Sequence, residues 1–198
     1  LMYELMEQIA ANAGAEAHYT VLPSKRVDAA MEQGEVDLHC LMSPVWFKQA
    51  VPAARWRVPV LRLDDWLTAK PGSPAKPLVL EAQQQTAVGL VLGYSYPQLE
   101  PFFRAGQLYR DDAPTQELLL EKLARGRTRY AVVNRLVIDD YNRSRAPSQR
   151  LVPLQMVESF NTHCLLSART VIAPARILAA VRKLVDSGQL QTIQARYR

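Results

Sequence analysis

The stretch Gly34-Glu-Val-Asp-Leu-His-Cys-Leu-Met-Ser43 marks a place where a helix ends and a buried strand begins. Before it, Val27 and Met31 lie one helical turn apart, so Gly34 is well placed to end a helix in the left-handed conformation. Residues 36–42 are mostly apolar, which is typical of a strand covered on both faces. The stretch therefore predicts a helix, a glycine cap and a buried strand in direct succession.

The same pattern returns about ninety residues further along the chain. Leu119 and Leu123 lie one helical turn apart, Gly126 follows them, and residues 130–134 (Tyr-Ala-Val-Val-Asn) form a second apolar run. Two helix–glycine–strand units at this separation indicate two α/β lobes of similar build. A ligand is then expected where the carboxyl ends of the strands of the two lobes face each other.

The composition is that of a globular protein with real hydrophobic cores. The chain has 198 residues, of which 48% are hydrophobic and 22% charged, enough for one larger domain or two small lobes. No apolar run approaches the roughly eighteen residues that a membrane-spanning helix needs. The net charge is +5, but the basic residues are scattered, and no basic helix or aromatic-interleaved stripe is present. We therefore expect neither a membrane span nor nucleic-acid binding.

The two cysteines, Cys40 and Cys164, both lie in apolar runs that are typical of strands. We expect two buried free thiols. A disulfide is the alternative, in an oxidising compartment, if the two strands are neighbours. The sequence has no Cys-x-x-Cys or other metal-binding spacing, so no metal site is expected.

No catalytic motif is present in the sequence. His163 directly precedes Cys164, so their side chains point to opposite faces of a strand and make a poor catalytic dyad. The neighbouring carboxylates of Asp64 and Asp65 likewise do not converge on one face. No nucleophile-elbow, zinc-protease or phosphate-loop pattern occurs. We therefore predict a protein that is not an enzyme and that needs no cofactor.

Hydropathy and turn residues predict the remaining elements. An amphipathic helix over 2–13 carries Leu5 and Ile9 on one face. The segment 70–77, with three prolines and a glycine, is the clearest linker in the chain. The expected strands are 17–22, 36–42, 56–61, 66–68, 87–92, 129–134, 150–155 and 160–167. The expected helices are 2–13, 24–33, one from Pro97 onward, 114–124, 135–142, and two in the tail that are separated by Gly188.

Six motifs occur in the same order as in one known family, and together they span nearly the whole chain. They are a helix followed by Gly34-x-x-Asp37 and a strand, Trp56-Arg-Val-Pro59-Val, Val88-Gly-Leu-Val-Leu-Gly93, Leu123-Ala-Arg-Gly126 before a strand, a return strand at 162–166, and Val181-x-x-Leu184-x-x-x-Gly188-x-x-x-x-Ile193-x-x-x-Tyr197. In these motifs the sequence resembles the extracytoplasmic solute-binding proteins of family 3, which serve ABC transporters of the amino-acid type. The resemblance implies a two-lobed, periplasmic-binding-protein-like (type II) α/β fold that closes on a small solute by hinge motion. Each lobe would be a mainly parallel sheet flanked by helices.

The resemblance also implies a domain organisation. Lobe one comprises 1–70 and 160–198, lobe two comprises 71–159, and the hinge crossings lie near 66–73 and 157–162. The family usually opens with a strand and an aromatic loop, whereas this chain opens in the helix that follows them. We therefore expect the first strand of lobe one to be missing and the chain to be a fragment. The protein is expected to be periplasmic and monomeric, with a signal peptide that is not in this chain.

Two positions depart from the family's pattern. Members that bind α-amino acids have an arginine soon after the first motif strand, and its guanidinium pairs with the ligand carboxylate. That position is Gln49 here by ungapped count and lies near Trp46 by motif shape, with Lys48 and Arg55 as neighbouring substitutes. Such members also carry an aspartate for the ligand ammonium where this sequence has Asn134, which brings no charge. We therefore expect a ligand that is not gripped by the usual α-amino-acid clamp.

The strand ends that face the ligand in this fold provide the candidate site residues. They are Met42, Ser43 and Trp46 in lobe one, and Tyr94, Ser95, Tyr96, Asn134 and Arg135 in lobe two. Trp46 and Tyr94 are placed to sandwich a flat or apolar ligand. Free N–H groups near Ser95, ahead of the helix expected from Pro97, are placed to hold an anionic group.

The resemblance and the lack of catalytic motifs together predict a function. We expect non-catalytic binding of a small polar solute, anionic or aromatic in character, for uptake through the membrane subunits of an ABC transporter or for sensing. Two alternatives are an enzyme on the same fold, similar to cyclohexadienyl dehydratase, and an orphan pair of lobes used for protein contacts. Turnover of a cyclic carboxylic acid would favour the enzyme, and an open cleft with apolar walls would favour the orphan pair.

Overall fold

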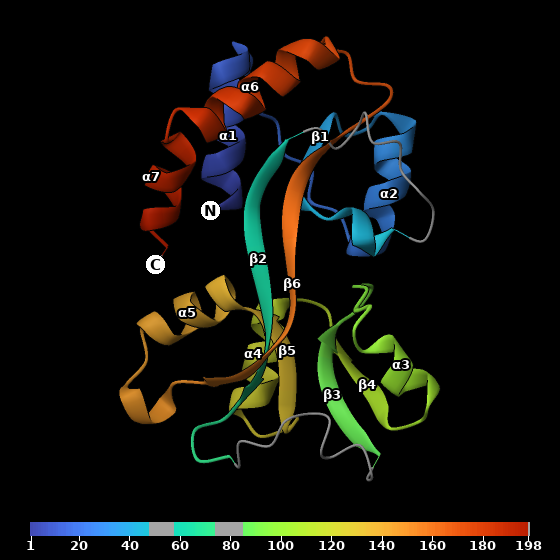
Figure 1. Cartoon of the computed structure of the whole chain (residues 1–198), viewed down its shortest axis with the longest axis vertical. Helices are drawn as coiled ribbons and strands as arrows, with labels where there is room; N and C mark the ends of the chain where they lie inside the picture. Colours follow the sequence, from blue (N-terminus) through green and yellow to red (C-terminus); the bar gives the residue numbers. More distant parts are fainter. Residues whose placement is uncertain (48–57, 74–84, 198) are drawn as a thin grey trace. The chain divides into compact units, whose positions relative to one another are not determined.

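The computed structural model describes residues 1–47, 58–73 and 85–197, and it confirms the predicted α/β class (Figure 1). The chain forms two compact units. Unit 1 comprises Leu1–Arg62 and Asn161–Arg198, and unit 2 comprises Leu63–Phe160. The chain passes between them within two long strands, β2 (Pro59–Ala69) and β6 (Val152–Leu166). The first passage therefore lies at residues 62–63, a few residues ahead of the range 66–73 expected from the sequence.

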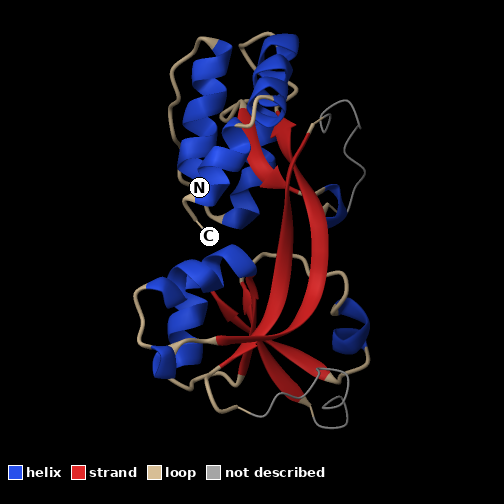
Figure 2. Ribbon diagram, turned by 60° about the vertical axis from the view of Figure 1, so that its left-hand side comes forward, coloured by secondary structure: helices blue, strands red, loops and turns tan. Residues whose placement is uncertain are grey.

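Unit 2 is built on strands β2, β5, β3 and β4, in that order across the sheet. Strand β3 (Thr86–Val91) runs parallel to β4 (Leu108–Ala113) and to β5 (Tyr130–Asn134), whereas β2 runs antiparallel to β5. Helices lie on both sides of these strands (Figure 2). They are α3 (Glu100–Arg104), α4 (Gln116–Ala124) and α5 (Arg135–Arg143), and the short helix η4 (Pro147–Gln149) precedes β6.

Two apolar cores stabilise unit 2, one on each face of the sheet. Leu67, Leu90 and Tyr130 belong to the core on the α3 side, and the leucines of α4 belong to the other. Helix α4 lies very close to the sheet at Gly89, because a Cβ atom there would meet the Leu119 side chain at 2.7 Å. Any other residue would force the Leu119 side chain to shift, and its Cβ would also lie 3.1 Å from the Tyr130 carbonyl oxygen.

The sequence analysis missed one strand of unit 2 and placed the bounds of other elements wrongly. Strand β4 was not predicted, because its charged residues interrupt the apolar pattern. The helix expected from Pro97 begins at Glu100 and has five residues, since residues 97–99 form a turn. The two strands expected at 150–155 and 160–167 are one strand of 15 residues, β6, whose backbone continues through the polar Glu158.

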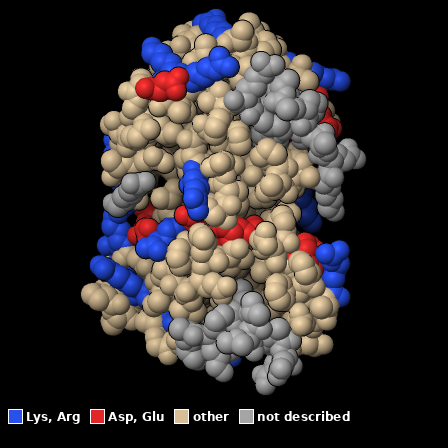
Figure 3. All heavy atoms as spheres, viewed as in Figure 1, with Lys and Arg blue, Asp and Glu red and all other residues tan. Residues whose placement is uncertain are grey.

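The charged side chains match the scattered pattern read from the sequence. Lysine and arginine are dispersed over the face drawn in Figure 3 and do not gather in one block. Among the helices that the structure describes, none is long and apolar enough to cross a membrane.

Unit 1 packs its helices around a short sheet. Helix α1 (Met2–Ala13) buries Leu5, Ile9 and Ala13, and packs against α6 (Pro174–Asp186), which is followed by α7 (Gln189–Ala195). Helix α2 (Ser24–Gln33) ends at Gly34 with φ +80°, which confirms the predicted glycine cap. Residues 17–22 are not a strand as predicted: they take no regular structure, and Val21 is 96% exposed. Their weak alternation does not correspond to a buried face.

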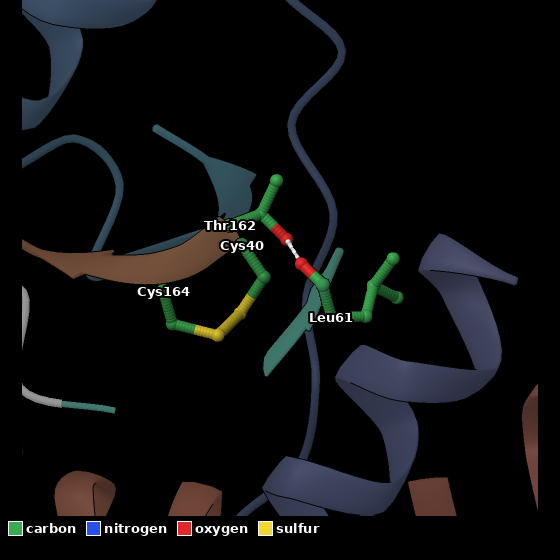
Figure 4. Close-up of a disulfide and its surroundings, with 4 residues drawn as sticks. All are labelled: Cys40, Leu61, Thr162 and Cys164. Atoms are coloured by element: carbon green, nitrogen blue, oxygen red, sulfur yellow. Dashed lines mark hydrogen bonds between the residues drawn. A yellow bond between two sulfur atoms is a disulfide. The ribbon is translucent and has the colours of Figure 1, made fainter. Parts of the chain in front are cut away.

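Strand β1 (Leu38–Met42) follows Gly34, and the short helix η1 (Pro44–Trp46) comes next. Strand β1 pairs antiparallel with β6, and His39 lies opposite Leu165. Continuing this register by one residue brings Cys40 opposite Cys164, and the two form a disulfide, so the expectation of free thiols is wrong (Figure 4). Beside it, the hydroxyl of Thr162 donates to the carbonyl of Leu61 at 2.7 Å, which ties β6 to β2 within unit 1.

Candidate functional site

The carboxyl ends of the parallel strands β3, β4 and β5 lie at one edge of the sheet of unit 2. In open α/β sheets, ligands bind at this edge because the strands end there and loops diverge. Strand β2 runs the other way, so its residues near the unit boundary reach the same edge, and Asp65 lies directly opposite Asn134. The edge therefore collects residues that are far apart in the sequence.

Asn134 holds three elements together at this edge. Its side-chain oxygen accepts a hydrogen bond from the Leu136 N–H at 3.1 Å and so caps α5. Its side-chain nitrogen donates to the Asp65 carboxylate at 3.2 Å, and its backbone N–H donates to the side chain of Gln116 at 2.9 Å. Asn134 is therefore engaged in positioning its neighbours, and Asp65 supplies the carboxylate at this place.

The pKa of Asp65 is raised to about 6. Burial is the main cause, and the negative charges of Glu158 and Asp64 add to it, while the hydrogen bond from Asn134 opposes the rise. A carboxyl group with a pKa this close to neutrality is common at functional sites, where burial and neighbouring like charges act together.

Glu158 is a second enclosed carboxylate near Asp65. Its residue is 8% exposed, and one carboxylate oxygen accepts a hydrogen bond from the Gln98 N–H at 2.7 Å. The other oxygen, Oε2, is buried and has no hydrogen-bond partner among the residues that the structure describes. Burial also raises the pKa of Glu158. Because buried polar atoms are nearly always paired, Oε2 is a place where a ligand donor would be accepted.

The two tyrosines predicted as site residues have different environments. Tyr96 is 2% exposed within the core, and its hydroxyl accepts a hydrogen bond from the Val91 N–H at 3.1 Å. Tyr94 is 42% exposed. Burial of its hydroxyl raises the pKa of Tyr94, the charge of Asp65 raises it further, and a hydrogen bond with Gln116 opposes the rise. Tyr94 thus presents an exposed ring whose hydroxyl belongs to the Asp65 network.

Arg135 and Ser95 complete the predicted set in unit 2. The guanidinium of Arg135 pairs with Asp139 one turn along α5 at 2.9 Å, and lies over the ring of Trp66. Its charge is therefore already balanced within the helix. Ser95 is exposed, but the N–H groups of Leu99 and Glu100 donate to the Tyr96 carbonyl, so they are not free to hold an anion.

The candidate residues of unit 1 lie together at the end of β1. Met42 packs beside the small core of Met31 and Leu165, and Ser43 is buried. Trp46 ends η1, is half-buried, and its N–H donates to the Ser43 carbonyl at 3.1 Å. The other residues that the sequence put forward here, namely Lys48, Gln49 and Arg55, lie outside the described part of the chain.

Sequence reasoning missed Asp65, Glu158 and Gln116. Asp65 was set aside because neighbouring side chains on a strand diverge, yet this geometry lets Asp65 meet a residue of another strand. Figure 3 shows acidic and basic side chains close together near the part of unit 2 that β2 enters. The edge of unit 2 thus holds several carboxylates, although the whole chain is basic.

Among the residues described, no group of three or more histidine, cysteine or carboxylate side chains is arranged to hold a metal ion. Besides arginines that pair with aspartates, the polar groups at the edge are carboxylates, amides and a phenol. They can accept and donate hydrogen bonds and can hold a positive charge.

Comparison with solved structures establishes the fold. No protein-family model matches the sequence, and no curated protein matches it. An ancestral arginine-binding protein bound to arginine superposes with a TM-score of 0.79 at 16% identity, over 98% of this chain and 86% of the other. The amino-acid ABC transporter substrate-binding protein AbpA from Streptococcus pneumoniae, bound to L-arginine, gives 0.74 at 15% identity, over 98% and 81%. A histidine kinase sensor domain similar to periplasmic binding proteins gives 0.73 at 20% identity, over 98% and 84%. The chain has the periplasmic-binding-protein-like fold of these proteins.

Proposed function

We propose that this protein binds a small polar solute outside the cytoplasm without converting it, and presents it to a membrane partner. The observation that carries the proposal is the carboxyl edge of unit 2, which brings together the half-buried Asp65, the buried Glu158 and the exposed Tyr94. Similar structures with this fold bind amino acids or act as sensor domains. The partner is then an ABC transporter or a sensor kinase.

The disulfide supports a location outside the cytoplasm. Cys40 and Cys164 are joined within unit 1 and are buried, with 0% and 4% exposure. Structural disulfides persist in oxidising compartments such as the periplasm and are rare in the reducing cytosol. A periplasmic location also agrees with the use of this fold in solute capture.

The test is a binding screen combined with a search for turnover. Thermal unfolding of the protein is followed with amino acids, amines, organic acids and small aromatics, and each hit is confirmed by calorimetry. A solute at a hundred times its dissociation constant adds about 2.7 kcal/mol of stability, which moves the midpoint by several degrees. NMR of the same samples is expected to show the solute unchanged after hours.

A matched pair of exposed tyrosines locates the site. Tyr94→Ala is expected to weaken binding about tenfold or more, because the ring lies at the carboxyl edge. Tyr109→Ala is the control, since Tyr109 is 54% exposed near the start of β4. Equal loss in both variants contradicts the placement. Turnover of a cyclic carboxylic acid replaces the proposal by a dehydratase-like activity, and a complete lack of hits replaces it by a protein-contact role.

A further inference from the structure

We infer that Asp65 and Glu158 together form a subsite for a cationic group of the solute, an ammonium or a guanidinium. This inference rests on the proposed function, because it names the chemistry of the solute that the same edge would bind. It goes beyond that proposal, which leaves the charge of the solute open.

The first argument is the state of Glu158. Its side chain is more than nine-tenths buried, and one oxygen is held by the Gln98 N–H while Oε2 has no hydrogen-bond partner among the described residues. A carboxylate in this position costs free energy unless it is paired and hydrogen-bonded. A cation that donates hydrogen bonds meets both needs at once.

The second argument is the state of Asp65. One carboxylate oxygen accepts the hydrogen bond from Asn134, and within the described ranges no lysine or arginine forms an ion pair with Asp65 or with Glu158. The two groups lie on neighbouring strands of the sheet, β6 and β2, and the hydroxyl of Ser159, next to Glu158, donates to the carboxylate of Asp64, next to Asp65, at 2.5 Å. Two acidic groups with no cation of their own attract one from outside.

The third argument is that the arginines at this edge already have their own partners. Arg110 pairs with Asp112 at 2.9 Å and donates to the carbonyl of Val91. The Nε–H of Arg135 donates to both carboxylate oxygens of Asp139, at 2.9 and 3.0 Å. Because each arginine is balanced by an aspartate of its own, neither is needed to neutralise the two enclosed carboxyl groups.

The fourth argument is the exposed aromatic side chain of Tyr94 at the same edge. The ring of Tyr94 is exposed, and its hydroxyl is coupled to Asp65 through charge and to Asn134 through Gln116. Proteins bind ammonium and guanidinium groups with aromatic rings and carboxylates, because both attract a cation. An anionic solute would be repelled by the same residues.

The experiment compares the binding of three cationic probes with that of an uncharged analogue of one of them. Putrescine, agmatine and arginine are the cationic probes, and 1,4-butanediol is the uncharged analogue of putrescine. Their binding to the whole chain is measured by calorimetry at pH 7.5 in low salt. We expect at least one cationic probe to bind and the diol not to bind. Comparing the affinity for agmatine with that for arginine shows whether binding also requires a carboxylate on the solute.

Two isosteric variants test the residues. Glu158→Gln and Asp65→Asn keep the shape and the acceptor oxygen but remove the charge, and each is expected to raise the dissociation constant of the cationic probe about 10- to 100-fold. Asp140→Asn is the control, because Asp140 is exposed and pairs with Arg143 on α5. Circular dichroism confirms that each variant is folded.

The possible outcomes separate the two proposals. If the wild-type protein binds only uncharged or anionic solutes, the inference is overturned while the proposed function stands. If cationic probes bind equally well to Glu158→Gln, Asp65→Asn and the control, the subsite is also overturned. If no solute in the panel binds, both proposals fall together.

Discussion

Replacing Asp65 by asparagine is expected to stabilise the ligand-free protein at neutral pH. The carboxyl group has a pKa of about 6 in the folded chain, against an ordinary value of 3.8. A pKa raised by burial means that ionising the group costs more in the folded than in the unfolded state. Asparagine has nearly the same shape, keeps an acceptor for Asn134 and carries no charge, so it avoids this cost.

The size of the effect follows from the shift in pKa. A change from 3.8 to about 6 is roughly two units, which at about 1.4 kcal/mol per unit gives about 3 kcal/mol at most. The hydrogen bond from Asn134, which is stronger for a carboxylate than for a neutral acceptor, opposes the rise and is already contained in this shift. We therefore expect Asp65→Asn to add up to about 3 kcal/mol to the free energy of unfolding at pH 7.5.

The raised pKa also determines how the stability gain of the variant changes with pH. Because the pKa is higher in the folded state, the stabilising contribution of Asp65 is fully present below about pH 4 and is lost as the pH rises through 6. The variant lacks this titration. Its advantage over the wild type is therefore expected to be small at pH 4, to grow between pH 4 and 6, and to level off above pH 7.

The measurement is urea unfolding of the wild type, Asp65→Asn and Asp140→Asn at pH 4.5, 6.0 and 7.5. The exposed control is expected to change stability by less than about 0.5 kcal/mol at every pH. A gain for Asp65→Asn that does not vary with pH, or a loss of stability at pH 7.5, refutes the reasoning from burial. A gain in stability together with a loss of cation binding is the pattern of a group retained for function.

Three further predictions concern the scaffold. Reducing the Cys40–Cys164 disulfide, or replacing both cysteines by alanine, is expected to cost about 2–5 kcal/mol in urea unfolding because the bond closes a segment of 124 residues; equal stability with and without reductant would contradict this. Gly89→Ala is expected to cost about 1–3 kcal/mol, since its Cβ would lie 2.7 Å from the side chain of Leu119, and an unchanged unfolding midpoint would show that α4 yields freely. Thr115→Ala removes the side-chain cap of α4 and is expected to cost about 1 kcal/mol, whereas Thr115→Ser is expected to cost less.

Local chemistry made part of the fold predictable. Gly34 and Gly126 were expected to end helices, and both have positive φ, at 80° and 71°. A helix end needs a left-handed residue whatever the rest of the fold does, so a single glycine after an apolar stripe is enough to find it. The strands after these glycines were also found, because their apolar runs are short and continuous, but only β5 is buried throughout, whereas β1 buries Cys40 alone.

Pairing between distant strands was not predictable in the same way. β6 was divided in two because Glu158 and its polar neighbours interrupt the apolar pattern, yet a strand continues wherever its backbone finds partners. The disulfide was left open because it depends on β1 and β6 being neighbours, which no local signal encodes. The candidate residues of unit 1, including Trp46, remain predictions.

The most informative departure is at Asn134, where the resemblance led us to look for an aspartate. Asp65 lies 69 residues earlier and directly opposite, and accepts the hydrogen bond of the Asn134 amide at 3.2 Å. A second carboxylate at this distance would repel that of Asp65 and raise the pKa of one of the two groups further, which a neutral residue at 134 avoids. The edge therefore still carries a negatively charged group although residue 134 is an asparagine. Asn134 keeps the cap of α5, donates to Asp65, and leaves the carboxylate one strand away, where Glu158 lies close by. A carboxylate is therefore present on the neighbouring strand, as the proposed cationic subsite requires.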